Sequence, residues 1–95
     1  MRFEWDEDKN RTNKIKHHLS FETAKGVFAD PLHRSIPDRI EDGEQRWQTI
    51  GMIGGILLLL VAHTYEDDSG DQVVRIISAR KANRKERREY ENGRN

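Results

Sequence analysis

Apolar and polar residues recur along the first part of the chain at spacings that predict a short strand followed by two helices. Residues 2–5 (RFEW) alternate, which predicts a strand with Phe3 and Trp5 on one side. Asp6 is a typical N-cap and is followed by acidic residues, so we expect a helix that ends near His17. The apolar side of this helix is small: Thr12, Ile15 and Leu19.

A second helix is predicted after Ser20, which is also a typical N-cap residue. Its apolar residues recur at helical spacing: Phe21, Ala24, Val27 and Phe28. Asp30-Pro31 should end this helix, because the residue before a proline is displaced from the helical region. Residues 32–39 are expected to be extended, and Pro37 indicates an edge strand because proline cannot donate a ladder hydrogen bond.

Three further segments predict strands: residues 46–53, 56–63 and 72–78. The first alternates, with Thr49 and Gly51 on the same face. The second is continuously apolar, as expected for a central strand that is covered on both faces. Gly54-Gly55 between them is typical of a hairpin, since glycine tolerates positive φ, and residues 65–71 (YEDDSGD) predict a polar loop.

The last segment is dominated by charged residues and predicts a helix from Ala79 to about Glu91, with a disordered tail at residues 92–95. The predicted order is therefore β-α-α-β-β-β-β-α. This order indicates an α+β fold, with helices packed on an antiparallel sheet. We expect residues 1–91 to form a single domain, because 95 residues rarely fold as two.

The composition narrows the class of protein. The chain has 17 basic and 17 acidic side chains and a net charge of zero, which argues against a uniformly basic nucleic-acid binder. It has no cysteine, so disulfide and thiolate chemistry are excluded. The longest apolar stretch, residues 52–62, is shorter than the roughly 20 residues that span a membrane as a helix. We therefore expect a cytoplasmic protein with no membrane association.

The charge is unevenly distributed along the chain. Residues 1–78 hold 10 basic and 14 acidic side chains, for a net charge of −4, whereas residues 79–95 carry a net charge of +4. The basic side chains of the second segment are Arg80, Lys81, Arg84, Lys85, Arg87, Arg88 and Arg94. Such a run is either a solvated helix face with Arg–Glu pairs or a localised surface for an anionic partner.

Three sequence blocks resemble a known family. FEWDEDKNRTNKIKHHLSFETAKGVFADP is similar to the opening of the BrnT toxins of bacterial type II toxin–antitoxin systems, and GEQRWQTIG and RIISARKANRKERREYE are similar to two later blocks. The resemblance implies a RelE-like fold and a ribonuclease that inhibits translation. It also implies a BrnA antitoxin, a ribbon-helix-helix protein through which the complex binds operator DNA. We expect two toxins to bind two antitoxins.

One residue departs from the family pattern. The family usually has glycine after Lys-His, where this chain has His18. Glycine would suit a left-handed residue just past a helix end. We expect His18 either to adopt that conformation at some energetic cost or to change the turn beside His17.

The residue types favour ribonuclease chemistry without a metal or another cofactor. The chain has no HExxH motif, no Cys/His zinc spacing and no glycine-rich phosphate loop. RNA carries its own nucleophile, the 2′-hydroxyl, so the protein need supply only a base, an acid and cations that stabilise the phosphorane. Guanidinium suits the last role because it binds phosphate through two parallel hydrogen bonds.

Arg75 and Arg80 are the first catalytic candidates. Arg75 interrupts the β-branched strand VVRIIS, and Arg80 follows where the strand is expected to become a helix. In a regular strand the two side chains would point to opposite faces, so they share a site only if the chain bends near Ser78-Ala79. The alternative for Arg75 is a simple position on the solvent face.

His63 and His17 are candidates for the acid and the base. The alternatives are a structural histidine at His63, and at His17 a side chain that caps the last helical carbonyls. Six residues are candidates for RNA contact: Lys9, Asn13, Lys16, Arg84, Arg87 and Arg88. A different class of function also fits the chain, namely a non-catalytic module that binds the antitoxin and acts as a co-repressor.

Overall fold

The computed structural model describes residues 1–93; residues 94–95 lie outside the described part of the chain. The strands are β1 (Arg2–Trp5), β2 (Arg34–Glu41), β3 (Glu44–Ile53), β4 (Leu57–Asp68) and β5 (Asp71–Lys81). The helical segments are α1 (Glu7–His17), α2 (Phe21–Ala24), the 3₁₀ segment η1 (Lys25–Ala29) and α3 (Arg84–Asn92). Their order confirms the predicted α+β arrangement.

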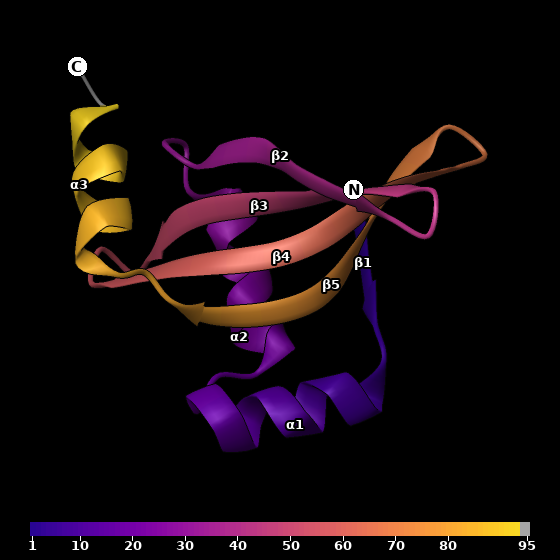
Figure 1. Cartoon of the computed structure of the whole chain (residues 1–95), viewed down its shortest axis with the longest axis horizontal. Helices are drawn as coiled ribbons and strands as arrows, with labels where there is room; N and C mark the ends of the chain where they lie inside the picture. Colours follow the sequence, from indigo (N-terminus) through magenta and orange to yellow (C-terminus); the bar gives the residue numbers. More distant parts are fainter. Residues whose placement is uncertain (94–95) are drawn as a thin grey trace.

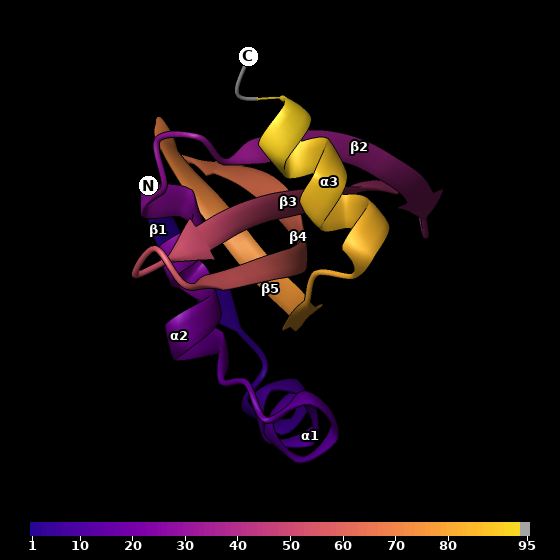
Figure 2. The ribbon, with the colours of Figure 1, turned by 90° about the vertical axis from the view of Figure 1, so that its left-hand side faces the viewer.

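The five strands form one sheet in the order β1-β5-β4-β3-β2. Segments α2 and η1 cover one face of this sheet, and α3 lies against the other face near one end (Figures 1 and 2). We call the first the helix face and the second the α3 face. Strand β2 is an edge strand, as Pro37 predicted. Within residues 1–93, no helix is long and apolar enough to cross a membrane.

The sheet is not wholly antiparallel, which corrects the prediction. Strand β1 pairs with β5 in parallel, with Phe3 beside Val74 and Trp5 beside Ile76. This pairing joins the first strand to the last. Local periodicity could not reveal it, because alternation shows which residues share a face and not which way a neighbouring strand runs.

Strands β4 and β5 extend beyond their predicted ends. Residues 65–71 were predicted as a loop, but they belong mainly to the two strands, which turn at Ser69 and Gly70 with positive φ. At its other end β5 continues to Lys81, because residues 79–81 pair with β4. Helix α3 therefore begins only at Arg84, after the N-cap residue Asn83.

The predicted ends of the first two helices are largely confirmed. The Asp6 carboxylate accepts hydrogen bonds from the backbone N–H groups that follow it, and the Ser20 hydroxyl does the same for α2. His18 ends α1 in the left-handed conformation, with φ of 58°. Of the two expected outcomes, His18 therefore follows the first and adopts the left-handed conformation itself. At the other end of the chain, α3 ends at Asn92, a residue that was predicted to belong to the tail. Residues 94–95 of the predicted tail lie outside the described part of the chain.

Helix α1 buries amides instead of Thr12 and Ile15, for which the predicted apolar side is wrong, whereas Leu19, just after the helix, is buried in the core as predicted. Ile15 is 75% exposed, whereas Asn10 and Asn13 are buried. The Asn13 amide donates to the carbonyl oxygens of Leu19 and Ala79, and its oxygen accepts from the Ala79 N–H. Helix α1 is therefore attached to the outer edge of β5 mainly by hydrogen bonds.

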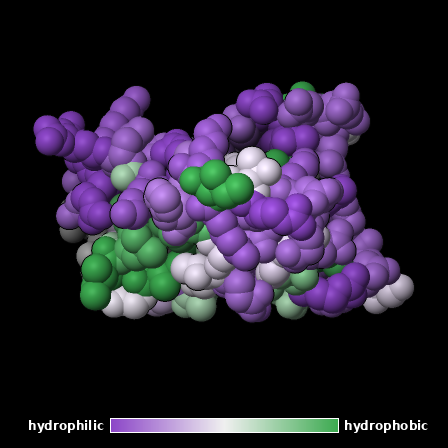
Figure 3. All heavy atoms as spheres, turned by 90° about the horizontal axis from the view of Figure 1, so that it is seen from below, coloured by the Kyte–Doolittle hydropathy of each residue, from purple (hydrophilic) through white to green (hydrophobic). Residues whose placement is uncertain are grey.

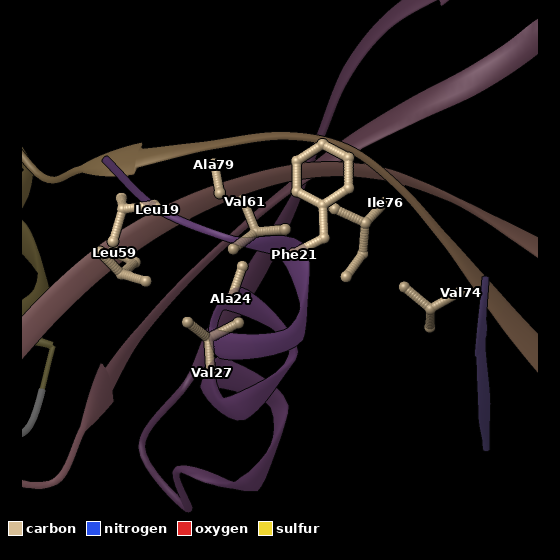
Figure 4. Close-up of a cluster of buried hydrophobic side chains, with 9 residues drawn as sticks. All are labelled: Leu19, Phe21, Ala24, Val27, Leu59, Val61, Val74, Ile76 and Ala79. Atoms are coloured by element: carbon tan, nitrogen blue, oxygen red, sulfur yellow. The ribbon is translucent and has the colours of Figure 1, made fainter. Parts of the chain in front are cut away.

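The core lies between the sheet and the segment formed by α2 and η1 (Figure 4). Its buried members are Leu19, Phe21, Ala24, Val27, Leu59, Val61, Val74, Ile76 and Ala79. The backbone of η1 approaches β3 so closely that a Cβ at Gly51 would lie 2.7 Å from the Val27 carbonyl oxygen. Glycine at this position thus allows the helical layer to seat on the sheet.

Candidate functional site

A β-bulge interrupts β5 between the two candidate arginines, Arg75 and Arg80. Successive residues of β4 pair with Ser78 and then with Ile76, so Ile77 is an extra residue without a direct partner. Such a bulge shifts the alternation of side chains by one position. No glycine or proline marks it in the sequence, so alternation alone predicted a regular strand.

The bulge places Arg75 and Arg80 on the same face of the sheet. Each arginine is next in sequence to a core residue: Arg75 to Ile76, and Arg80 to Ala79. Both core residues face α2, so both arginines project toward the opposite, α3 face. The sequence allowed Arg75 and Arg80 to share a site only if the strand was irregular near Ser78-Ala79. The structure has such an irregularity, and it lies at Ile77.

Arg75 is largely available to a ligand. Its side chain is 53% exposed, and one guanidinium nitrogen lies 3.8 Å from a carboxylate oxygen of Glu66. An exposed pair at this distance is worth little in water. An arriving phosphate could therefore compete with Glu66 for this guanidinium.

Arg80 is held more firmly. Its Nη1 and Nη2 donate to Oε1 and Oε2 of Glu86, each at 2.8 Å. The hydrogen bond from Arg80 lowers the pKa of Glu86 despite partial burial, and the same pair raises the pKa of Arg80. Glu86 also accepts from the Asn83 backbone N–H in the capping box of α3. Arg80 therefore fastens the start of α3 to β5, and a phosphate that bound it would have to replace a carboxylate.

A second polar anchor fixes the other end of α3. The Tyr90 hydroxyl donates to Asp30 Oδ2 at 2.6 Å, and the Met52 N–H donates to the same oxygen at 2.8 Å. Burial acts to raise the pKa of Asp30, but the hydrogen bonds from Tyr90, Met52 and Leu32 outweigh it, so the pKa is lowered. Sequence reasoning assigned Asp30 only the end of a helix and missed this role.

Between these anchors, α3 and the sheet enclose a groove of about 480 Å³. Its apolar floor comes from three strands: Ile36 on β2, Ile50 on β3 and Leu60 on β4. Glu86 and Glu89 of α3 line it on the other side. Arg34 also borders it and donates to the Glu89 carbonyl oxygen at 3.1 Å. Sequence reasoning did not identify this groove, because its walls come from four separate elements.

His63 is enclosed within the protein. Its side chain is fully buried, with Nε2 2.6 Å from the Thr49 hydroxyl and the rings of Phe28 and Tyr65 within about 5 Å. Burial lowers its pKa to about 4. RNA cannot reach this imidazole in the folded protein, so the structure favours the alternative of a structural histidine. The expectation that His63 ends a strand is wrong, since β4 continues to Asp68.

The candidates on α1 divide into two groups. Lys9, Lys16 and His17 line a groove of about 310 Å³ between α1 and β5, where they meet the bulge residues Ile77 and Ser78. The view from below shows a mainly hydrophilic surface, with apolar side chains gathered toward one end and a smaller apolar patch near the centre (Figure 3). The bulge thus borders this groove and lies between Arg75 and Arg80 along β5.

Asn13 belongs to the other group. It borders the same groove, but its amide is buried and already bonded to backbone groups, so it has a structural role. We therefore correct its assignment as an RNA-contacting residue.

The remaining candidates, Arg84, Arg87 and Arg88, lie on the outer surface of α3. All three are exposed and line a shallow hollow of about 250 Å³. Glu91 lines the same hollow, whereas Glu86 and Glu89 line the groove on the other side of α3. The predicted cationic helix is present, but it is shorter than expected, and its three exposed arginines share the outer face with one carboxylate.

Comparison with known proteins identifies the family and supports the fold. The family model described as "Ribonuclease toxin, BrnT, of type II toxin-antitoxin system" matches residues 5–86. The crystal structure of the Brucella abortus ribonuclease toxin BrnT is similar, with a TM-score of 0.66 and 26% sequence identity. The match covers 88% of this chain and 99% of that one. Curated protein sequences gave no match. The chain belongs to the BrnT ribonuclease toxin family of type II toxin–antitoxin systems.

Proposed function

We propose that this toxin is an endoribonuclease that cleaves RNA without a metal ion and thereby inhibits translation. The observation that carries the proposal is the bulge at Ile77. It puts Arg75 and Arg80 on one face of β5, and its residues Ile77 and Ser78 border the groove that Lys9, Lys16 and His17 line. Several cations around one backbone segment suit a phosphodiester whose charge increases in the transition state.

In the proposed reaction, the 2′-hydroxyl of one nucleotide attacks the adjacent phosphorus. The new O2′–P bond forms as the P–O5′ bond breaks, giving a 2′,3′-cyclic phosphate and a free 5′-hydroxyl. Arg75 stabilises the charge on the phosphorane, and Arg80 joins it when Glu86 gives way. His17 is the proposed proton-transfer residue, because an imidazole can both accept and donate a proton.

The remaining cations are proposed to hold the RNA strand. Lys9 and Lys16 extend the site along α1, while Arg84, Arg87 and Arg88 offer a second cationic surface on α3. Contacts of lysine and arginine with phosphate position a strand without reading its sequence. We therefore expect these residues to contribute to affinity more than to the choice of cleavage site.

The proposed partner is a BrnA-like ribbon-helix-helix antitoxin. Family membership implies a cognate antitoxin, and exposed arginines on a small domain suit an anionic segment that covers them. We propose a complex of two toxins and two antitoxins that binds operator DNA through the antitoxin, in the cytoplasm. Residues 1–91 would act in it as one domain.

The test is to incubate purified toxin with RNA in the presence of EDTA. Fragments that end in 2′,3′-cyclic phosphate support the proposal. If folded toxin leaves both free and ribosome-bound RNA intact, the proposal fails. Cleavage that needs an added divalent ion would overturn its metal-independent part.

A non-catalytic co-repressor is the second candidate, and the Arg80–Glu86 pair favours it. Two hydrogen bonds of 2.8 Å already occupy this guanidinium, as expected if its role is structural. This alternative predicts DNA binding only with the antitoxin and no loss of RNA. Expression of the toxin without its antitoxin separates the two, because only the ribonuclease should stop growth.

A further inference from the structure

The groove beneath α3 has the size of a small-ligand site. Its volume of about 480 Å³ lies within the range typical of small-molecule pockets. The groove is therefore large enough to take a single flat group such as a nucleobase.

The floor of the groove suits the face of a nucleobase. Ile36, Ile50 and Leu60 present apolar surface from three adjacent strands, and Ile36 remains 53% exposed. Stacking against side chains is how proteins commonly hold an unpaired base of single-stranded RNA. Glu86, the partner of Arg80, lines the same groove, so a base bound here lies beside an arginine that we propose for phosphate.

The rim of the groove favours one class of base. Glu89 lines the groove with an exposed side chain, and an ionised carboxylate can only accept hydrogen bonds. It therefore selects a base edge that presents donors. Guanine offers two neighbouring donors, N1–H and the 2-amino group, whereas adenine and uracil each pair an acceptor with a donor.

We propose that the groove beneath α3 is a guanine-binding subsite for the RNA substrate, with Glu89 as the residue that reads the base. The proposal rests on the ribonuclease function proposed above and adds a sequence preference to it. Arg34 lines the groove, and Arg80 is hydrogen-bonded to Glu86, which also lines it, so two guanidinium groups lie close enough to suit the phosphate of a bound nucleotide.

The first test compares Glu89→Gln with Glu91→Gln. Both variants remove one negative charge from α3, but Glu91 lines the outer hollow instead of the groove. Cleavage is measured on two oligonucleotides that are identical except at one position, which holds guanosine in the first and inosine in the second. Inosine lacks the 2-amino group of guanosine. We expect wild type and Glu91→Gln to prefer guanine by about tenfold, and Glu89→Gln to lose the preference. Equal preferences in all three proteins would overturn the proposal.

The second test compares Ile36→Glu with Ile40→Glu. Both residues are exposed on β2, at 53% and 69%, so neither change should disturb folding, and both alter the net charge equally. Only Ile36 lines the groove. With guanosine 5′-monophosphate as the probe, we expect NMR shifts at Ile50 and Leu60 in wild type and Ile40→Glu, and none in Ile36→Glu.

The outcomes separate this inference from the proposed function. If wild type cleaves no RNA, the ribonuclease proposal fails, whatever the groove binds. If RNA cleavage and its base preference are unchanged in Ile36→Glu while antitoxin binding weakens, the groove is a protein-docking surface and the inference fails. Shifts caused by the nucleotide only at residues remote from the groove would also overturn it.

Discussion

The Tyr90 hydroxyl donates a 2.6 Å hydrogen bond to the carboxylate of Asp30, a residue 60 positions earlier in the chain. The same carboxylate oxygen accepts the N–H of Met52 on β3. Asp30 thus connects the end of η1, the sheet and the last helix. The C-terminal half of α3 is also held by Arg34, which donates to the Glu89 carbonyl oxygen, so polar groups contribute to the attachment of this helix.

Tyr90→Phe should loosen α3 and lower the stability of the protein. The change removes a hydrogen bond to a charged, partly buried acceptor, a bond worth about 1.5–3 kcal/mol. Urea denaturation should show this loss of unfolding free energy, and hydrogen exchange should show faster opening of α3. Tyr65→Phe is the matched control, because its hydroxyl makes only a 3.4 Å hydrogen bond to Ser35. Similar losses in both variants would contradict the anchor role of Tyr90.

Stability should fall as the pH drops below about 6.5, because His63 is buried in its neutral form. Burial lowers its pKa from 6.5 to about 4, so the unfolded chain binds a proton more readily than the folded one between these values. The stabilisation is therefore complete above pH 6.5 and decreases toward pH 4. The full shift corresponds to about 3 kcal/mol.

The measurement is the unfolding free energy at several pH values for wild type and two variants. His63→Phe should reduce the pH dependence in this window, although it also costs stability because Thr49 loses a partner. His33→Gln removes an exposed histidine and is the control, and a slope that falls only in His63→Phe identifies the buried imidazole as the cause. An unaltered slope in His63→Phe would show that other groups cause the loss.

Arg75→Ala should abolish RNA cleavage and leave the thermal midpoint almost unchanged, because Arg75 is half exposed and makes one long ion pair. Arg80→Ala should reduce both cleavage and stability, because it leaves Glu86 without its partner at the start of α3. Cleavage rates and melting temperatures of the two variants provide the comparison. A cleaving Arg75→Ala protein would remove Arg75 from the site, and a stable, inactive Arg80→Ala protein would show that Arg80 is not required for folding.

The order of the elements could be predicted from the sequence because it depends on local signals. Asp6 and Ser20 cap helices within a few residues of themselves, and Gly54 and Gly55 form their turn with positive φ. Candidate residues could be named in the same way, since an arginine within VVRIIS stands out from its neighbours.

The geometry of the site could not be predicted, because it depends on pairing between strands. The extra residue Ile77 looks like any other strand residue, yet it decides which face Arg80 occupies. Arg80 and Glu86 were both assigned to one helix, where six residues of separation would not bring them together. They meet because β5 continues to Lys81 and the chain then turns at Asn83.

Helix α1 gives the most direct test of this dependence on tertiary contacts, because its apolar residue is exposed and its asparagines are buried. Asn13→Leu should destabilise the protein by about 3 kcal/mol or more, since it leaves the N–H and C=O of Ala79 and the C=O of Leu19 without partners. Ile15→Ser, at a position that is 75% exposed, should change stability by less than about 0.5 kcal/mol. A hydropathy argument predicts the reverse, because it expects leucine to stabilise the helix and serine to weaken it. Urea denaturation of the two variants decides between these accounts, and a stable Asn13→Leu protein would show that apolar contact can replace the amide hydrogen bonds.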